Sequence, residues 1–499
     1  MTPQMGLDLG HELVVDLFAG GGGASWGIEN GIGRPVDIAV NHDPQAVRMH
    51  EANHPHTQHY CESVFDVKPL AVTGGQPVGL LWASPDCTHH SKAKGGKPVS
   101  ANRRGLAWVV TDWARDVAPR VIMLENVEEF EDWGPLDESG RPCPVRKGET
   151  FREWVQALED QGYTVDWRQL RACDYGTPTI RRRLFVIARR DGRKIVWPKP
   201  SHGAPDSLPV RRGSQQPFRT AAQCIDWSIP CASIFERKRP LAENTMRRIA
   251  EGMRRFVLES EDPFLVSCDE GLAAPSLVGI DHGGARTGCS WSAREPLTTT
   301  TTENRHALVT AFLAKHFTGV IGTGLDKPAA TVTARDHHAL VSAYMLNLKG
   351  TQRSARAADA PISTTCAGAT HAGLVAAFAA PYYGSGSGET GRDLRDPAPT
   401  TTAKDRLQLV TVTIDGETYV VTDIGMRMLQ PRELFRANGF PDNYIIAPEW
   451  NGKPLPKYAQ TRMCGNSVPP QWPEVLVGAN FIHERRIPDA GKGADKEAV

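Results

Sequence analysis

The chain has 499 residues, of which 40% are hydrophobic and 23% are charged. That length fits two or three domains, and the apolar share excludes disorder as the dominant state. No apolar run approaches the roughly 20 residues of a membrane-spanning helix, and the N-terminal residues lack a basic-then-apolar signal pattern, so we expect a cytoplasmic protein. Ten cysteines without a C-x-x-C pair indicate neither a disulfide scaffold nor a zinc ribbon.

Basic residues are concentrated locally although the net charge is zero, with 57 Lys and Arg against 57 Asp and Glu. Ten basic and four acidic residues lie between Arg211 and Arg255, and nine basic and two acidic residues lie between Arg168 and Lys194. A solvated helix face explains such runs, and so does a surface that binds phosphates. The residues that we expect to contact phosphate are Arg211, Arg212, Arg237, Lys238, Arg239, Arg247 and Arg248.

The first 195 residues alternate apolar strands with helices. Helices are predicted over 106–117 and 151–158, and strands over 13–18, 36–40, 78–82, 121–124, 164–170 and 184–188. Strands that are apolar throughout and joined by helices indicate a parallel sheet covered on both faces. Ligands of such sheets bind at the carboxyl ends of the strands, so we expect the chemistry there.

The composition changes after Pro198, where Pro, Gly, Ser and Thr become frequent. A degenerate repeat begins at Pro296, Pro328, Pro361 and Pro397, and its Thr-rich units favour short strands. Polar pairs such as Arg305-His306 recur in this repeat. Either the repeat is only a scaffold of short strands, or loops that carry these pairs line a groove for a ligand. Helix signals return at Pro431 and over 471–485. The predicted divisions are 1–197, 198–424, 425–488 and a polar tail over 489–499.

The first candidate site is the sequence DLFAGGGG, in which a strand runs into four glycines and then a helix. It includes Asp16, Phe18, Gly20 and Gly22. Glycines allow close approach of the backbone to a ligand, and a helix N-terminus offers N–H groups. The pattern is not G-x-G-x-x-G, and no lysine follows as in a phosphate-binding loop. An adenosyl cofactor without pyrophosphate therefore fits better than a dinucleotide.

Cys87 follows the strand 78–82 in the sequence SPDC. A thiolate at a strand end is suited to attack a deactivated ring carbon. The alternative is a small hydrophobic residue in a tight turn. His89 and His90 lie nearby, but further ligands at zinc spacing are missing, so no metal is predicted.

Charged residues follow two other apolar strands. Glu125 ends the strand 121–124 and is either solvated or, in a closed pocket, protonated and able to donate to a ring nitrogen. In TIRRRLF, strand alternation places Arg181 and Arg183 on one face and Arg182 on the other. The arginine pair suits a phosphate or a carbonyl oxygen, or forms surface ion pairs.

Taken in order, these motifs resemble the DNA cytosine-5 methyltransferase family. DLFAGGGG is similar to its first cofactor motif, SPDC to its nucleophile motif, LENV to its glutamate motif and TIRRRLF to its arginine motif. ELFRANGFPDNY and GNSVPP resemble its last two motifs, although the Asn and Ser of GNSVPP alone suggest caps of the last helix. The resemblance covers residues 11–197 and 425–485. It implies a Rossmann-like α/β methyltransferase sheet and a second, mostly β or irregular, target-recognition domain.

The resemblance also implies a reaction. A methyl group would pass from S-adenosylmethionine to carbon 5 of cytosine in a specific double-stranded DNA sequence, through a Cys87 adduct and base flipping. Glu125 would act at ring nitrogen 3, Arg183 would hold the ring oxygen, and Arg181 would orient both. The cofactor contacts implied are Asp16, Phe18, Gly20, Gly22, Asn41, Asn466 and Ser467.

The sequence departs from the family pattern at several positions. Asp86 and Thr88 replace the Pro and Gln that usually flank the nucleophile, and Thr179 replaces a Gln before the arginines. The acidic residue expected at the cofactor ribose falls on Asn41 or on Asp43. None of these changes removes a nucleophilic or proton-transferring group, but they leave the ribose contact open.

Two other functions remain open at this point. The same chemistry could act on RNA or with a modified one-carbon donor, or the chain could be a catalytically silent DNA-binding homologue. The joint presence of Cys87, Glu125, Arg181 and Arg183 argues against the silent homologue. We expect a bacterial or phage-encoded enzyme that acts as a monomer on DNA. Its recognition sequence and any cognate restriction endonuclease are left open.

Overall fold

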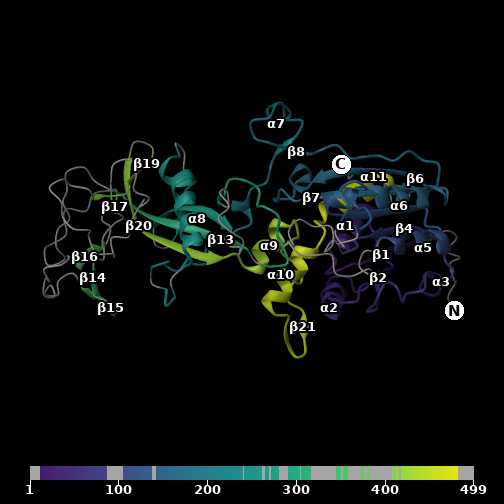
Figure 1. The fold of residues 1–499 in the computed structure, drawn as a ribbon, viewed down its shortest axis with the longest axis horizontal. Helices are drawn as coiled ribbons and strands as arrows, with labels where there is room; N and C mark the ends of the chain where they lie inside the picture. The colour runs from purple at the N-terminus through teal and green to yellow at the C-terminus, as the bar shows by residue number, and fades with distance from the viewer. Residues whose placement is uncertain are drawn as a thin grey trace, which may run out of the picture. The chain divides into compact units, whose positions relative to one another are not determined.

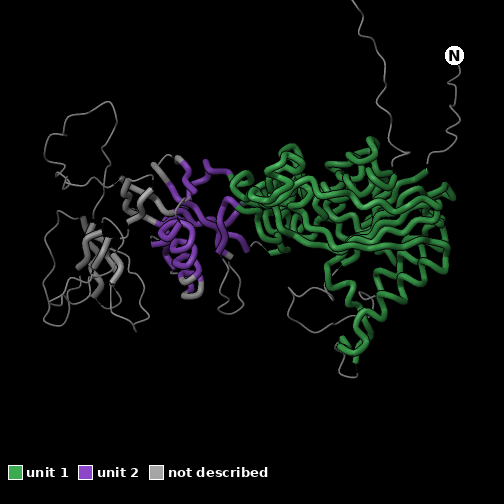
Figure 2. Tube along the Cα trace, turned by 90° about the horizontal axis from the view of Figure 1, so that it is seen from above, with its two compact units in different colours: residues 1–225, 295–304, 430–499 green, residues 226–294, 305–429 purple. Residues whose placement is uncertain are grey.

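The computed structural model divides the chain into two compact units, coloured separately in Figure 2. Unit 1 comprises residues 1–225, 295–304 and 430–499, and unit 2 comprises 226–294 and 305–429. Unit 1 therefore runs past residue 197, where the sequence suggested a boundary, and includes 295–304 from within the region 198–424. The structure describes residues 12–86, 105–137, 142–235, 237–239, 241–260, 264–268, 271–279, 290–303, 305–315, 344–349, 352–357, 372–375, 379–381, 407–409, 411–414 and 417–481.

Unit 1 is built on a seven-stranded sheet with the order β3-β2-β1-β4-β5-β7-β6. Figure 1 labels β1, β2, β4, β6 and β7 of this sheet. Its strands are β1 (Leu13–Leu17), β2 (Ile38–Val40), β3 (Gln58–Tyr60), β4 (Val78–Ala83), β5 (Val121–Asn126), β6 (Thr164–Arg171) and β7 (Arg182–Arg189). The strands β1 to β5 pair in parallel, as the apolar runs predicted. β3 was not predicted, because its residues are polar or half-buried.

The prediction of an entirely parallel sheet is wrong at β7, which pairs antiparallel with both β5 and β6. No crossover helix joins β6 to β7: the described connection contains only the short 3-10 helix η3 (Ala172–Tyr175) and a few further residues. A connection this short joins antiparallel neighbours, whereas a parallel pair needs a longer crossover. The sheet is therefore mixed.

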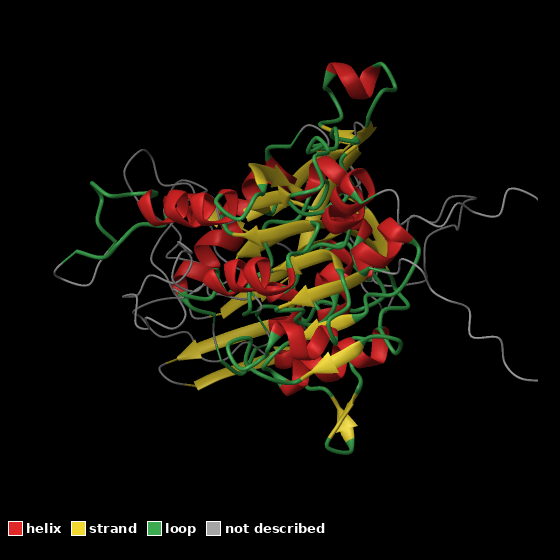
Figure 3. Ribbon diagram, turned by 90° about the vertical axis from the view of Figure 1, so that its right-hand side faces the viewer, coloured by secondary structure: helices red, strands yellow, loops and turns green. Residues whose placement is uncertain are grey.

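Helices cover both faces of this sheet (Figure 3). Helices α1 (Gly23–Ile32) and α11 (Gln471–Asn480) bury their apolar residues with Val14 of β1 and Met123 of β5. On the other face, α5 (Trp108–Val117) and α6 (Glu149–Glu159) pack with Val15 and Leu124. Alternate side chains of a strand point to opposite faces. The same alternation puts Asp16, Glu125 and Arg183 on the face covered by α1 and α11.

The helices predicted near the C-terminus are present, but their caps differ from those expected. Helix α9 (Pro431–Ala437) begins with a capping box between Gln430 and Glu433. The expectation that GNSVPP caps the last helix is wrong. Asn466 is the last residue of α10 (Lys457–Asn466), and α11 begins after Pro470 without a side-chain cap.

The remaining elements of unit 1 are short and surround the sheet. They are α2 (Pro44–Asn53), α3 (Pro69–Thr73), η2 (Glu128–Asp132), β8 (His202–Gly203), α7 (Leu208–Arg211), β9 (Gln216–Pro217), η4 (Ala221–Gln223), β21 (Glu449–Trp450) and β22 (Lys453–Pro454).

Unit 2 contains an antiparallel sheet with the order β10-β11-β13-β20-β19, to which β12 adds by pairing with β11. Helix α8 (Glu243–Met253) and the π-helix η5 (Arg254–Leu258) cover it, with Ile249, Val278, Val309 and Ile424 in the core. The strands of unit 2 as a whole are β10 (Val266–Cys268), β11 (Gly271–Gly279), β12 (Ser290–Ser292), β13 (His306–Lys315), β14 (Tyr344–Lys349), β15 (Gln352–Ala357), β16 (Ala372–Val375), β17 (Ala379–Pro381), β18 (Leu407–Leu409), β19 (Thr411–Ile414) and β20 (Glu417–Met428). Within the described residues of the whole chain, no helix combines the length and apolarity needed to cross a membrane.

Candidate active site

The glycine-rich turn lies at the carboxyl end of β1. Phe18, Gly20 and Gly22 all have positive φ angles, of 62°, 56° and 96°. A Cβ atom at Gly22 would lie 2.6 Å from His54 Nε2 and 2.5 Å from the Tyr444 hydroxyl oxygen, so this position excludes side chains. Gly22 precedes α1, whose N-terminus has no side-chain cap. The first turn of α1 thus lies at the carboxyl edge of the sheet, where the sequence predicts a ligand.

The GNSVPP segment packs directly on the first turns of α1. A Cβ atom at Gly23 would collide with Ser467 Oγ, and one at Gly27 would collide with the Pro470 carbonyl. Glycine is required here because the two backbones approach closely. Exposed Asn466 and buried Ser467 are therefore held beside the glycine-rich turn. Two segments that the sequence assigned to one cofactor site lie together.

Asn41 lies just after β2, at the same edge of the sheet. Its Oδ1 accepts a hydrogen bond of 2.8 Å from the backbone N–H of Asp43. Asp43 itself caps α2 and forms an ion pair of 2.7 Å with Arg462. Both side chains are engaged in contacts, so these contacts do not decide between Asn41 and Asp43 for the expected ribose contact.

Glu125 and Arg183 meet at the end of β5. The Nε atom of Arg183 lies 3.0 Å from Glu125 Oε1, and the side chains of Arg183 and Glu125 are 15% and 8% exposed. Burial raises the pKa of Glu125, and the positive charges of Arg183 and Arg181 oppose this effect. A buried carboxyl group with a raised pKa can hold a proton and donate it to a ring nitrogen.

Arg181 is fully enclosed, with 2% of its surface exposed. Its guanidinium group donates to the carbonyls of Gly465 and Thr300, at 2.9 and 3.2 Å. The segment 295–304 is fixed here by backbone bonds of 2.9 Å that join Leu297 to Pro178 and to Ile180. Arg181 is therefore a link between three segments of unit 1 and acts on the site through its charge near Glu125.

Arg182 lies on the other side of the strand, as the alternation predicted. Its side chain is 58% exposed and its Nε atom lies 4.0 Å from Glu128 Oε1. The exposed position separates Arg182 from the buried pair Glu125 and Arg183.

The described part of the SPDC segment is attached to the ends of β1 and β5. The backbone N–H of Ser84 donates to the Leu17 carbonyl at 3.2 Å. The side-chain amide of Asn126 donates to the Pro85 carbonyl at 3.3 Å, so the residue after Glu125 contacts the residue two before Cys87. Cys87 and Thr88 themselves lie outside the described residues.

The basic residues expected at DNA are divided between the two units. Arg211 and Arg212 are exposed in unit 1, and Arg237, Lys238 and Arg239 are exposed in unit 2. The expectation is wrong for Arg248, which is 4% exposed on α8 and so has too little free surface to contact phosphate. The side chain of Arg247 is outside the described part of the structure.

His306 is also not available for a groove lining. It is 4% exposed in β13, and burial lowers its pKa from 6.5 to about 4. Its ring lies 6.2 Å from that of Trp291.

A group of buried polar side chains beneath the glycine-rich turn was missed by the sequence reasoning. It comprises Ser25 of α1, His50 of α2, His54 directly after α2, half-buried His59 of β3, and Tyr444. The spacing of His50 and His54, four residues apart, is the one available signal, and it does not distinguish a buried pair from an exposed one. Among the described residues, no group of three or more His, Cys, Asp or Glu has an arrangement that could hold a metal ion.

Comparison with known proteins gives a family match. The model of the family described as C-5 cytosine-specific DNA methylase matches residues 13–223 and 349–479, more than half of the chain. Among curated relatives, the type II methyltransferase M.SacI of Streptomyces achromogenes is 30% identical over 39% of this chain and 52% of its own length. M.AgeI of Thalassovita gelatinovora is 30% identical over 38% of this chain and 42% of its own length. The chain thus spans about half the length of the curated relatives it matches.

Solved structures also align with the chain. The S. pombe Dnmt2 methyltransferase is 13% identical with a TM-score of 0.44, over 95% of this chain and 98% of that one. A putative DNA modification methyltransferase encoded within an E. coli prophage is 17% identical with a TM-score of 0.39, over 95% and 99% of the two chains.

Proposed function

Because the chain belongs to the C-5 cytosine-specific DNA methylase family, we propose that it methylates carbon 5 of cytosine in a specific sequence of double-stranded DNA. The observation that carries this proposal is the contact between Glu125 and Arg183 at the carboxyl edge of the sheet. A carboxyl group with a raised pKa beside a guanidinium group matches the ring nitrogen 3 and the ring oxygen of cytosine.

Cytosine carbon 5 is a weak nucleophile until another group adds to the ring. The Cys87 thiolate would add to carbon 6, and the electron pair of the ring double bond would move to carbon 5. Glu125 would donate a proton to nitrogen 3 as this charge develops, while Arg183 holds the oxygen. After carbon 5 has gained the methyl group, it would lose its proton to water. The carbon–sulfur bond would then break, which regenerates the thiolate, and nitrogen 3 would return its proton to Glu125.

The residues at the glycine-rich turn fit S-adenosylmethionine, which supplies an electrophilic methyl group when bound. The fit rests on Asp16, whose Oδ1 is buried and has no hydrogen-bond partner among the described residues. The ligand carries positive charge, and a buried carboxylate oxygen beneath the turn complements it. Phe18, Gly20, Gly22, Asn41, Asn466 and Ser467 would line the rest of the site.

Double-stranded DNA is the proposed partner, and unit 2 with the basic residues of both units is the proposed recognition region. Extracting a base from the stack costs a few kcal/mol, which contacts to the DNA backbone must offset. Because the relatives above are type II methyltransferases, a cognate restriction endonuclease in a bacterial or phage-infected cell is part of this proposal. We propose that the chain acts as a monomer on DNA.

Trapping of the covalent adduct tests this function. Duplex DNA with 5-fluorocytosine at the target should become irreversibly attached to the protein when S-adenosylmethionine is present, because fluorine replaces the proton that must leave carbon 5. Cys87→Ala should form no adduct. Cys61→Ala changes an exposed cysteine as a matched control and should react as the wild type does.

Bisulfite sequencing of DNA from cells that express the wild type or Cys87→Ala identifies the target sequence for this experiment. Methylation in both strains, or an adduct with RNA but not with DNA, would contradict the proposal.

A further inference from the structure

Four side chains form a continuous row of hydrogen bonds beneath the glycine-rich turn. Ser25 Oγ lies 2.7 Å from Asp16 Oδ2 and 2.9 Å from His50 Nε2, and His50 Nδ1 lies 2.7 Å from His59 Nε2. Asp16, Ser25 and His50 are at most 1% exposed, whereas His59 is partly exposed. The row therefore leads from a fully buried carboxyl group to the surface.

The direction of every proton in this row follows from the carboxylate. An ionised Asp16 only accepts, so the Ser25 hydroxyl donates to it and must accept from His50 Nε2–H. The remaining ring nitrogen of His50 then accepts from His59 Nε2–H. Both rings are neutral in this arrangement, in agreement with burial, which lowers the pKa of His50 well below its usual value and also lowers that of His59.

Protonation of Asp16 reverses the row without breaking it. The Asp16 carboxyl would then donate to Ser25, Ser25 to His50 Nε2, and His50 Nδ1–H to His59 Nε2. Each histidine changes tautomer and neither changes charge. Two complete hydrogen-bond patterns therefore exist for the same four side chains, one for each charge state of Asp16.

The surroundings of Asp16 make both charge states accessible near neutral pH. Burial raises its pKa from 3.8 to about 7, the Ser25 hydrogen bond opposes the rise, and the negative charge of Glu29 adds to it. Glu29 also lies 2.9 Å from His54 Nδ1. The Tyr444 hydroxyl, which donates to the Gly21 carbonyl, is held neutral because burial raises its pKa well above 10. At the surface end, Glu51 acts on His59.

We propose that Ser25, His50 and His59 are positioning residues that orient Asp16 as the anion for a cationic adenosyl ligand and carry its proton to water when that ligand binds. The inference deepens the proposed function and rests on it. Protons are conserved at each step: Asp16 gives one to Ser25, Ser25 gives one to His50, His50 gives one to His59, and His59 releases one to solvent. Ser25 and both rings end neutral.

Calorimetric titration of the ligand-free protein with S-adenosylmethionine tests this proposal, in buffers of different ionisation enthalpy between about pH 6 and pH 8. We expect release of a proton on binding, and a Kd that rises about tenfold for each pH unit below about 7. Asp16→Asn should bind weakly at every pH and release no proton.

Two further variants separate the row of side chains from Asp16 itself. Ser25→Ala and His59→Leu remove the oriented donors at the two ends, so the midpoint of the pH dependence should move upward, by about half a pH unit or more. His56→Leu replaces an exposed histidine of the turn that precedes β3 and should match the wild type. A wild-type midpoint in both Ser25→Ala and His59→Leu, or a pH dependence that survives in Asp16→Asn, would overturn the inference.

A second measurement needs no ligand. Infrared difference spectra of the ligand-free protein should show the carbonyl band of a protonated buried carboxyl group that disappears as the pH rises through about 7 and is absent from Asp16→Asn. If Asp16→Asn fails to fold, Ser25→Ala should shift the pH at which this band disappears. Absence of S-adenosylmethionine binding at every pH would contradict the proposed function, whereas absence of the titrating band would contradict this inference alone.

Discussion

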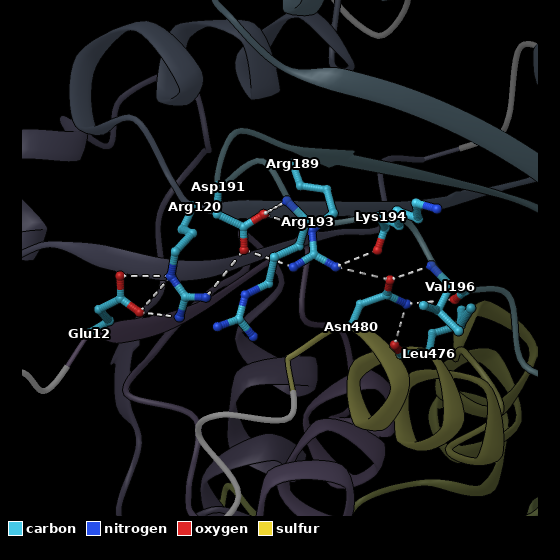
Figure 4. Close-up of polar contacts among 9 residues, drawn as sticks. All are labelled: Glu12, Arg120, Arg189, Asp191, Arg193, Lys194, Val196, Leu476 and Asn480. Carbon is cyan, nitrogen blue, oxygen red and sulfur yellow. Dashed lines mark hydrogen bonds and ion pairs between the residues drawn. The ribbon is translucent and has the colours of Figure 1, made fainter.

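The two edges of the seven-stranded sheet contain the same kinds of charged residue but differ in how completely these residues are paired. At the edge before β1 and β5 and after β7, Figure 4 shows Glu12, Arg120, Arg189 and Asp191 joined in one network. Arg120 Nε donates to Glu12 at 2.9 Å, and Arg189 donates twice to Asp191, at 2.9 and 2.7 Å. At the other edge, Glu125 meets one arginine atom and Asp16 one serine.

The pKa values of the carboxyl groups express this difference. Burial acts to raise the pKa of Asp191, but hydrogen bonds from Arg189 and from the backbone of Arg193 outweigh it, and the pKa is lowered. Burial prevails at Asp16 and Glu125, whose pKa values are raised. Asn480 completes the paired edge by bonding to the backbone of Val196 at 2.8 and 2.9 Å. At one edge the carboxyl groups are paired within the protein. At the other edge the buried carboxyl groups are less fully paired and can bind a ligand.

The largest expected effect of a single change concerns Glu125. Glu125→Gln keeps the size of the side chain but cannot transfer a proton, so methyl transfer should fall by about 10²–10⁴-fold. Transfer of a labelled methyl group to DNA measures it. A variant that retains more than a tenth of the activity would remove Glu125 from the proposed mechanism.

Asp191→Asn should affect stability rather than turnover. It leaves Arg189, whose side chain is 3% exposed, without its charged partner, and breaking a buried pair costs about 3 kcal/mol or more. Because the folded pKa of Asp191 is lowered, the stabilisation is present at neutral pH and is lost as the pH falls through that folded value. Urea unfolding measures the difference, and Arg115→Gln, which changes a side chain that is 63% exposed, should leave the unfolding midpoint unchanged. Equal losses of stability in Asp191→Asn and Arg115→Gln would contradict the contrast between buried and exposed ion pairs.

Asp16→Asn should raise the stability of the ligand-free protein, whereas Asp191→Asn should lower it. A carboxyl group whose pKa rises from 3.8 to about 7 on folding destabilises the fold above pH 7. The variant should therefore be more stable at pH 8, on the order of 2–4 kcal/mol, and the gain should shrink as the pH falls from about 7 toward 4. Thermal unfolding across this range tests it, and a gain that does not vary with pH would refute the assignment.

The smallest effect is expected at exposed basic residues of unit 2. Replacing Arg237, Lys238 and Arg239 by Ala should weaken DNA binding and reduce the slope of log K against log salt by about 0.9 for each phosphate that the variant no longer neutralises. Fluorescence anisotropy at several salt concentrations measures the slope. Arg248→Ala, a buried residue of the same run, should reduce stability instead. An unchanged slope in the triple variant would exclude these residues from the DNA interface.

The sequence predicts most of the parallel part of the sheet. Apolar runs suffice for β1, β2, β4 and β5, and strand alternation suffices to place Arg182 and Arg183 on opposite faces. They cannot fix the direction of β7, because a run such as Leu184–Ala188 is equally apolar read either way, and the short connection after β6 decides it.

Contacts between distant segments explain the other differences. The segment 295–304 reads as the start of a repeat, yet it pairs with residues 178–180, a partner more than a hundred residues away that no local pattern reveals. In the same way, the four-residue spacing of His50 and His54 does not show that both side chains are buried. Arg248 lies in a basic run and is nevertheless buried on α8, with 4% of its surface exposed.

The return of residues 295–304 to unit 1 has a consequence for engineering. The chain passes between the units four times, so unit 2 is not one continuous insert. A chimaera that replaced everything from 226 to 429 with the equivalent region of a relative would also exchange the backbone that accepts a hydrogen bond from Arg181. Grafting 226–294 and 305–429 as two separate cassettes, with the native stretch kept between them, preserves the surroundings of that arginine while the rest is exchanged.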